Sequence, residues 1–304
     1  MRAYFFIFTL LTSFAFAQEK KHTFQNTRIK AEYHTKDGLF DGKYISYYTN
    51  GKKKAEGDYK NNLRTGKWNV WDSTGKLHAE HQFRPEKPER NAQGFFNYTV
   101  LKEEDVMIEK RVWREIRRSE NPLLFSDASF FDVLFDLIQT DSLAIFGDDD
   151  LTRPRTKENI QDMVGSNYFI IDSYKEKEDW FIDKKTNEAV IRPAALQIVL
   201  TPRNAESNEK IELGWVYFPQ LRKVLAAQKI NDKRCPLIKN LDDIFWYHYV
   251  VSQIYKELNV YDRPFSAYAK TPEAAAYEAE RAEIDMIEME HDAWLFGDKA
   301  LDHW

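Results

Sequence analysis

The sequence predicts an α+β protein with an N-terminal head of β-hairpin repeats, a central antiparallel sheet with packed helices, and an acidic C-terminal helix. Three observations predict this class. A short aromatic pattern repeats near the N-terminus, runs rich in β-branched residues fill the centre, and an Ala/Glu-rich stretch closes the chain. With 304 residues, 43% of them hydrophobic and 31% charged, the chain can form a substantial core and is not disordered.

Residues 1–17 have the three parts of a secretory signal. Arg2 supplies a positive start, an apolar run follows, and Ala15-Phe16-Ala17 is the small-x-small pattern that precedes cleavage. A buried N-terminal helix or strand is the alternative. We expect cleavage before Gln18 and an exported protein. The apolar run is too short to cross a bilayer and no other is present, so an integral helical membrane protein is excluded.

Residues 18–83 contain a repeat with a period of 24 residues. The features that recur are Gly42-Lys43-Tyr44 as Gly66-Lys67-Trp68, Tyr47 as Trp71, Gly51-Lys52 as Gly75-Lys76, and Ala55-Glu56 as Ala79-Glu80, with Ala31-Glu32 one period earlier. Aromatic residues favour sheets and the Gly-Lys steps suit tight turns, which predicts two full hairpin units and a partial one ahead of them. The pattern resembles MORN-type repeats, which implies a scaffold or interaction surface.

The aromatic residues of the repeat, Tyr44, Tyr47, Trp68 and Trp71, allow two interpretations. They pack between neighbouring hairpins, or they stack against a ligand. Packing is the simpler expectation, because aromatic residues in strands commonly fill the space between elements.

Residues 84–94 hold two prolines and mixed charges, which predicts a linker to a main domain at 95–270. There, Ile108, Val112 and Ile116 recur every fourth residue and predict a helix. Ser129 is placed to cap a second helix from Phe130.

Four strands are expected in the middle of the main domain, at 168–171, 180–182, 189–200 and 211–218, with polar turns at 174–179 and 202–210. Pro193 falls inside the third strand and should lie at an edge or a bulge.

Three further helices are expected toward the C-terminus. Pro219 is suited to begin one, and Asn240 to cap a longer one whose apolar stripe runs from Ile244 to Leu258. Thr271 and Pro272 predict the start of a tail helix within residues 271–304.

Charge is unevenly distributed along the chain. Residues 18–83 carry 13 basic against 8 acidic side chains, whereas residues 271–304 carry 2 against 10. The basic head either is a solvated face or attracts phosphate or acidic envelope polymers. The acidic tail has little evident reason to fold back on a core, so we expect a solvated terminal helix or a docking arm for a basic partner.

No catalytic, cofactor or metal site is expected from motifs. His78 and His81 would point to opposite faces of a strand, Asp148-Asp149-Asp150 lacks the calcium-loop pattern, and Cys235 is a lone cysteine. No phosphate-cradling glycine loop is present. A hydrolase with a carboxylate-only site stays an alternative, because 49 acids could conceal one.

Five phrases in the main domain, taken in order, resemble one family. They are Lys110–Ile116, Phe130–Leu134, Trp180–Lys184, Trp215–Pro219 and Asp242–Arg263. Together they resemble the GldN/PorN gliding-motility family, periplasmic subunits of the type IX secretion machine. The resemblance implies a non-enzymatic subunit on the inner face of the outer membrane that forms a ring with a PorK/GldK-like lipoprotein. A PorM/GldM-like trans-periplasmic component would lie nearby, and no nucleic acid is involved.

Within this region Trp113, Arg114, Tyr261, Asp262 and Arg263 are the candidate interaction residues, because aromatic residues and arginine often dominate interfaces. An internal salt bridge that caps the helix expected before Tyr261 is the alternative. The rival function is a module in which the MORN-like repeats bind an envelope glycan or acidic polymer.

Overall fold

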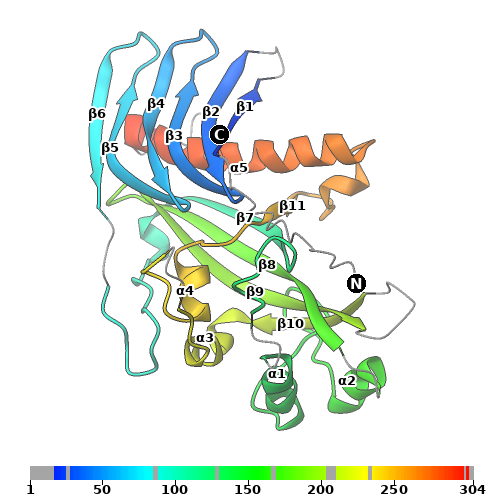
Figure 1. The fold of residues 1–304 in the computed structure, drawn as a ribbon. Coiled ribbons are helices and arrows are strands. Elements are labelled where there is room, and N and C mark those ends of the chain that lie inside the picture. Colours follow the sequence, from blue (N-terminus) through cyan, green and yellow to red (C-terminus); the bar gives the residue numbers. More distant parts are fainter. Residues whose placement is uncertain are drawn as a thin grey trace, which may run out of the picture.

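Two antiparallel sheets lie on either side of one long helix (Figure 1). The computed structural model describes residues 17–24, 28–84, 88–126, 130–165, 169–202, 210–231, 235–297 and 299–300. Residues 1–16 of the expected signal at 1–17 and the expected cap Ser129 lie outside these residues. Sheets and helices together confirm the α+β class. Among the described helices, none combines the length and the apolar character needed to cross a bilayer.

The head is a six-stranded sheet in which every strand pairs with its neighbour in sequence. Its strands are β1 (Gln18–Thr23), β2 (Ile29–Lys36), β3 (Leu39–Tyr47), β4 (Lys53–Lys60), β5 (Leu63–Trp71) and β6 (Leu77–Phe83). Gly42 lies opposite Tyr59 and Gly66 opposite Phe83, and a bulge follows at the same place in each hairpin. The partial unit is therefore a complete hairpin in three dimensions, since β1 and β2 show the same register and the same bulge.

The inner face of the head is closely packed. Tyr44 and Trp68 are fully buried, in a cluster with residues of the C-terminal helix. Gly57 makes room for the indole of Trp68, because a Cβ at this position would lie 2.1 Å from the ring. The repeat thus forms a sheet with one apolar face, which must pack against another element to be buried.

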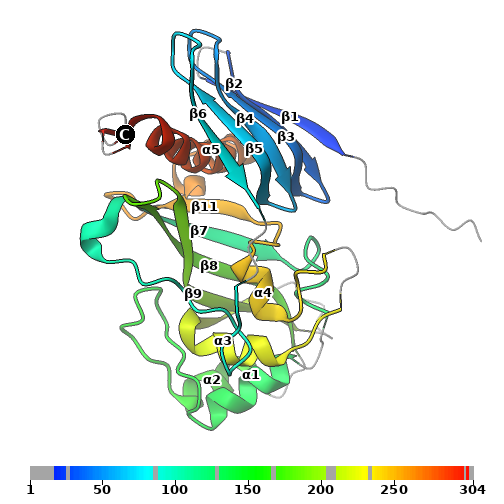
Figure 2. The same ribbon diagram turned by 90° about the vertical axis from the view of Figure 1, so that its left-hand side faces the viewer.

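The body is a five-stranded sheet in the order β10-β9-β8-β7-β11, with helices on one side (Figure 2). Its strands are β7 (Val106–Arg117), β8 (Phe169–Asp183), β9 (Ala189–Pro202), β10 (Ile211–Tyr217) and β11 (Gln253–Glu257). Its helices are η1 (Glu103–Asp105), α1 (Phe130–Gln139), α2 (Lys157–Val164), α3 (Phe218–Ala227), α4 (Leu241–Trp246) and η2 (Phe265–Ala267). The largest core cluster joins this sheet to α1, α3 and α4.

The helix predicted from Ile108, Val112 and Ile116 is wrong, because these residues lie in β7. Residues four apart share one face of a strand as well as of a helix, so their spacing does not separate the two structures. Pairing with β8 along almost the whole length of β7 decides in favour of the strand.

The turn predicted at 174–179 is also wrong, because β8 continues through it as one strand of 15 residues. Glu176, Lys177 and Glu178 in this stretch are buried, and Lys175 and Asp179 are partly exposed on a paired strand and not in a loop. The expectation for Pro193 is confirmed: Glu178 lies opposite Pro193 while Lys177 lies opposite Ala195, which leaves Ala194 as the extra residue of a bulge.

The long helix predicted after Asn240 ends at Trp246. Asn240 caps α4 as expected, by accepting a hydrogen bond from the Asp243 amide. His248 has a φ of 49°, which a continuing α-helix cannot contain, and the chain then forms β11 along the outer edge of β7. The predicted stripe was therefore a short helix, a turn and a strand.

Helix α5 (Pro272–Phe296) begins at the predicted cap Thr271 but is not a solvated arm. Its second half is largely buried, with Ile284 and Trp294 in the head cluster and Ala282 and Met286 against the body. The basic partner of the acidic tail is the chain's own head. The ion pairs that join them include Lys30 with Asp285, Lys54 with Glu288 and Asp292, and Arg64 with Glu290.

Candidate functional site

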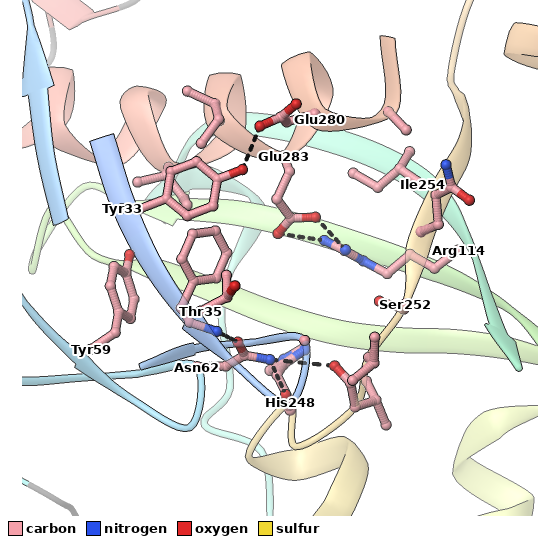
Figure 3. Close-up of a pocket in the computed structure, with 18 of the residues that line it drawn as sticks. Tyr33, Thr35, Tyr59, Asn62, Arg114, His248, Ser252, Ile254, Glu280 and Glu283 are labelled. Atoms are coloured by element: carbon pink, nitrogen blue, oxygen red, sulfur yellow. Dashed lines mark hydrogen bonds and ion pairs between the residues drawn. The ribbon is translucent and has the colours of Figure 1, made fainter. Parts of the chain in front are cut away.

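A cavity of about 510 Å³ lies where the head, α5 and the body meet (Figure 3). The head contributes an aromatic wall of Tyr33, Phe40 and Tyr59, and α5 contributes Glu280 and Glu283. Tyr33 donates a hydrogen bond to Glu280 and Arg114 pairs with Glu283, so these polar groups of the lining are already paired within the chain. The cavity therefore lies at the interface of three parts of the molecule.

Arg114 joins α5 to the body sheet at this cavity. It is 5% exposed, donates from Nε to Glu178 at 3.0 Å, and forms an ion pair with Glu283 of α5 at 2.5 Å. Burial alone would lower the pKa of Arg114, but the carboxylates of Glu178 and Glu283 outweigh it and raise that pKa. Arg114 is therefore a permanently charged link between two layers.

Two buried glutamates of β8 lie beside this link. Burial and the neighbouring Glu178 raise the pKa of Glu176 well above its ordinary value. Burial opposes ionisation of Glu178 too, yet Arg114 and then His248 lower its pKa. The Nδ1 atom of His248 lies 3.5 Å from the second oxygen of Glu178.

Acids with separated pKa values are what general acid–base chemistry requires. However, neither Glu176 nor Glu178 is among the residues that line the cavity, and both are almost fully buried. Within the described ranges, no group of three or more His, Cys, Asp or Glu side chains could hold a metal ion. The buried ionisable groups of Arg114, Glu176 and Glu178 therefore fit a role in holding the layers together better than a role in hydrolysis.

Trp113 points to the opposite face of β7 from Arg114. Its Nε1 donates to Asp149 at 2.7 Å, and the ammonium of Lys256 lies 3.9 Å from its ring centroid. Lys256 in turn pairs with Asp262 at 2.5 Å. The structure thus brings together two of the candidate interaction residues, Trp113 and Asp262, that stand far apart in the sequence.

Tyr261, Asp262 and Arg263 lie in a turn after β11, not at the end of a helix as predicted. Tyr261 is 73% exposed and Val260 97%. The Asn259 side chain holds the turn, since its amide donates to two carbonyls and its oxygen accepts from the amides of Tyr261 and Arg263. The result is an ordered turn with apolar side chains directed to solvent.

The repeat aromatics divide between the two faces of the head. Tyr44 and Trp68 lie under α5 and are not accessible to a ligand. Tyr47 and Trp71 are partly exposed, and the Tyr47 hydroxyl donates to Glu32 at 2.8 Å.

The sequence interpretation missed the ion pairs between head and tail. Lys54 lies 2.7 Å from both Glu288 and Asp292, and all three are nearly buried. Lys30 and Lys54 occupy equivalent places 24 residues apart, and both pair with acids of α5. The sequence does contain a signal for these pairs, namely the opposite net charges of the head and the tail. Opposite charges of this size predict that the two segments contact each other.

A comparison with known protein families matches a large part of the chain. The sequence model described as gliding motility associated protein GldN matches residues 101–295, which include the body strands and nearly all of α5 but not the head. No curated protein matches the chain. Because the match covers more than half of its residues, the chain belongs to the GldN family, whose members are components of gliding motility and type IX secretion.

Proposed function

We propose that this protein is a non-catalytic, exported subunit of the type IX secretion and gliding machinery. It docks in the periplasm to a PorK/GldK-like outer-membrane lipoprotein and contributes to a ring, with a PorM/GldM-like component nearby. Membership of the GldN family supports the assignment of the protein to this machinery. The role as a structural subunit is supported by the use of the charged groups around the cavity, which join head, helix and body.

The observation that carries the docking proposal is the apolar turn Leu258–Arg263. Leu258, Val260 and Tyr261 are 63%, 97% and 73% exposed, and no other stretch of the described chain has three exposed large apolar side chains within four positions. Asn259 and the pair of Lys256 with Asp262 order this turn in advance. An ordered contact loses little entropy on binding, so a tyrosine presented in this way is suited to an interface.

Affinity purification of a tagged copy from detergent-solubilised envelopes of the native host tests the proposal. We expect an outer-membrane lipoprotein in near-equal amount with the unmodified protein, and its loss with Val260→Ser combined with Tyr261→Ser. Val100→Ser is the matched control, because Val100 is 86% exposed at a distant position in the sequence.

Both substituted side chains of the turn are exposed, and the contacts that order it come from the Asn259 side chain and the Lys256–Asp262 pair, so the variant should keep its fold. Recovery of the unmodified protein without any lipoprotein would contradict the proposed function. Retention of the lipoprotein by the double variant would reject the turn as the docking surface.

A further inference from the structure

The junctions between hairpins of the head repeat their register without change. At the junction of β2 with β3, Ala31 lies opposite Ser46 and Glu32 opposite Ile45. At the junction of β4 with β5, 24 residues later, Ala55 lies opposite Val70 and Glu56 opposite Asn69. The same inter-hairpin contact is thus built twice within one chain.

The two outer strands of the head each present half of this junction. In the described part of the chain, β1 pairs only with β2 and β6 only with β5. Helix α5 spans the width of the sheet beneath them, with Tyr277 stacked on His22 of β1 and Trp294 stacked on His81 of β6. Strand β6 is equivalent to β2 and β4, and β1 is equivalent to β3 and β5, as their hairpin registers show.

We propose that β6 of one copy pairs with β1 of a second copy and so continues the repeat from chain to chain. Extending the register of the two internal junctions places Ala79 opposite His22 and Glu80 opposite Lys21. The occupant of each edge is therefore another molecule of this protein.

Charge favours this pairing over the other ways in which two edges could meet. At the two internal junctions Glu32 and Glu56 lie opposite the uncharged Ile45 and Asn69. At the junction between copies Glu80, which pairs with Lys67 inside its own chain, would also lie directly opposite Lys21, a lysine that already pairs with Glu32 across the β1–β2 hairpin. Opposite charges directly across a sheet are stabilising and like charges are not. Pairing of β1 with β1 would bring Lys20 and Lys21 near their own copies.

The contact is heterologous, because two different edges meet, so it leads to a ring or an open filament and not to a closed dimer. Its role in a ring rests on the proposed function, whereas the pairing itself rests only on the head. A single pair of short strands buries little area and is weak alone, so it should act where copies are held side by side.

Cysteine cross-linking of the full chain tests the register. Lys21 and Glu80 are each about half exposed, so Lys21→Cys and Glu80→Cys should leave the fold intact. Residues directly opposite in an antiparallel sheet have Cα atoms roughly 4.5–5.5 Å apart, within the disulfide range. Cys235 is buried, which makes the unmodified protein a suitable background.

Mixing the two single variants at high protein concentration under mild oxidation should give a disulfide-linked dimer, and the double variant in one chain should give a ladder of higher species. Glu19→Cys mixed with Glu80→Cys is the control, because Glu19 lies on the same face of β1 but two residues out of register. The same mixtures are oxidised in envelopes of the native host.

A yield several-fold above the control, in either setting, supports the pairing. Equal yields from matched and shifted pairs in both settings would overturn it. If the cross-link forms but no lipoprotein co-purifies, the proposed function fails and the pairing of β6 with β1 still holds.

Discussion

At the scale of single residues, Glu176 and Glu178 show how one buried layer can displace two pKa values in opposite directions. Arg114 donates to Glu178 and lowers its pKa, whereas burial and the nearby charge of Glu178 raise that of Glu176. The folded protein therefore holds Glu176 in its neutral form over a range of pH in which the unfolded chain would release the proton.

This predicts a pH-dependent gain in stability from Glu176→Gln. Because the folded pKa is raised, the contribution of Glu176 is fully favourable below its unfolded pKa of about 4.5 and is lost as pH rises toward the folded value. We expect the variant to be more stable than the unmodified protein at pH 8 and equal to it near pH 4. The gain in the free energy of unfolding at pH 8 should be about 1.4 kcal/mol for each unit by which folding raises the pKa of Glu176.

Urea unfolding at the two pH values measures the effect. Glu109→Gln, at an exposed position of the paired strand β7, should change stability at neither pH. A Glu176→Gln protein that is less stable at pH 8 than the unmodified one would show that Glu176 is ionised and paired.

At the scale of elements, α5 is held to the head by buried ion pairs and not by apolar contacts alone. Burial would lower the pKa of Lys54, yet Glu288 and Asp292 raise it, and Lys54 in turn outweighs burial and lowers the pKa of Glu288. A buried charge that loses its partner is costly, so the acids of α5 depend on the strand residues that face them.

We expect Lys54→Ala to lower the free energy of unfolding by about 3–5 kcal/mol at pH 7, because two buried carboxylates lose their partner. The adjacent Lys53 pairs with Glu56 at the surface, so Lys53→Ala should cost less than about 1 kcal/mol. Denaturant unfolding of both variants measures the difference, and equal effects would mean that the pairs with α5 contribute no more than surface pairs.

At the scale of the whole molecule, α5 belongs to the cores of both sheets. Ile284 and Trp294 pack in the head cluster, whereas Ala282 and Met286 pack against the body. Among the described strands, none belongs to both sheets. We therefore expect them to unfold as one cooperative unit through the helix.

Ile284→Ala tests this cooperativity, because Ile284 is fully buried and contacts the head cluster. The change should cost about 2–5 kcal/mol. Native-state hydrogen exchange should then quicken in β7–β9 of the body by the same factor as in β3–β5 of the head. Faster exchange confined to the head would show two independent units.

The sequence by itself determined the features that depend on neighbouring residues. The period of 24 placed the hairpins, Asn240 and Thr271 marked the caps of α4 and α5, and five ordered phrases indicated the family. Each of these signals comes from local backbone geometry or from spacing within a short stretch, which is present in the chain before it folds.

Only the tertiary structure decided the rest. Ile108, Val112 and Ile116 fit a helix or a strand until β8 pairs with them, and the charges of Glu176 and Glu178 suggest a turn until other layers cover them. The acidic tail appeared solvated because its partner Lys54 stands more than 230 residues earlier. Contacts between distant segments set these outcomes, and local patterns do not contain them.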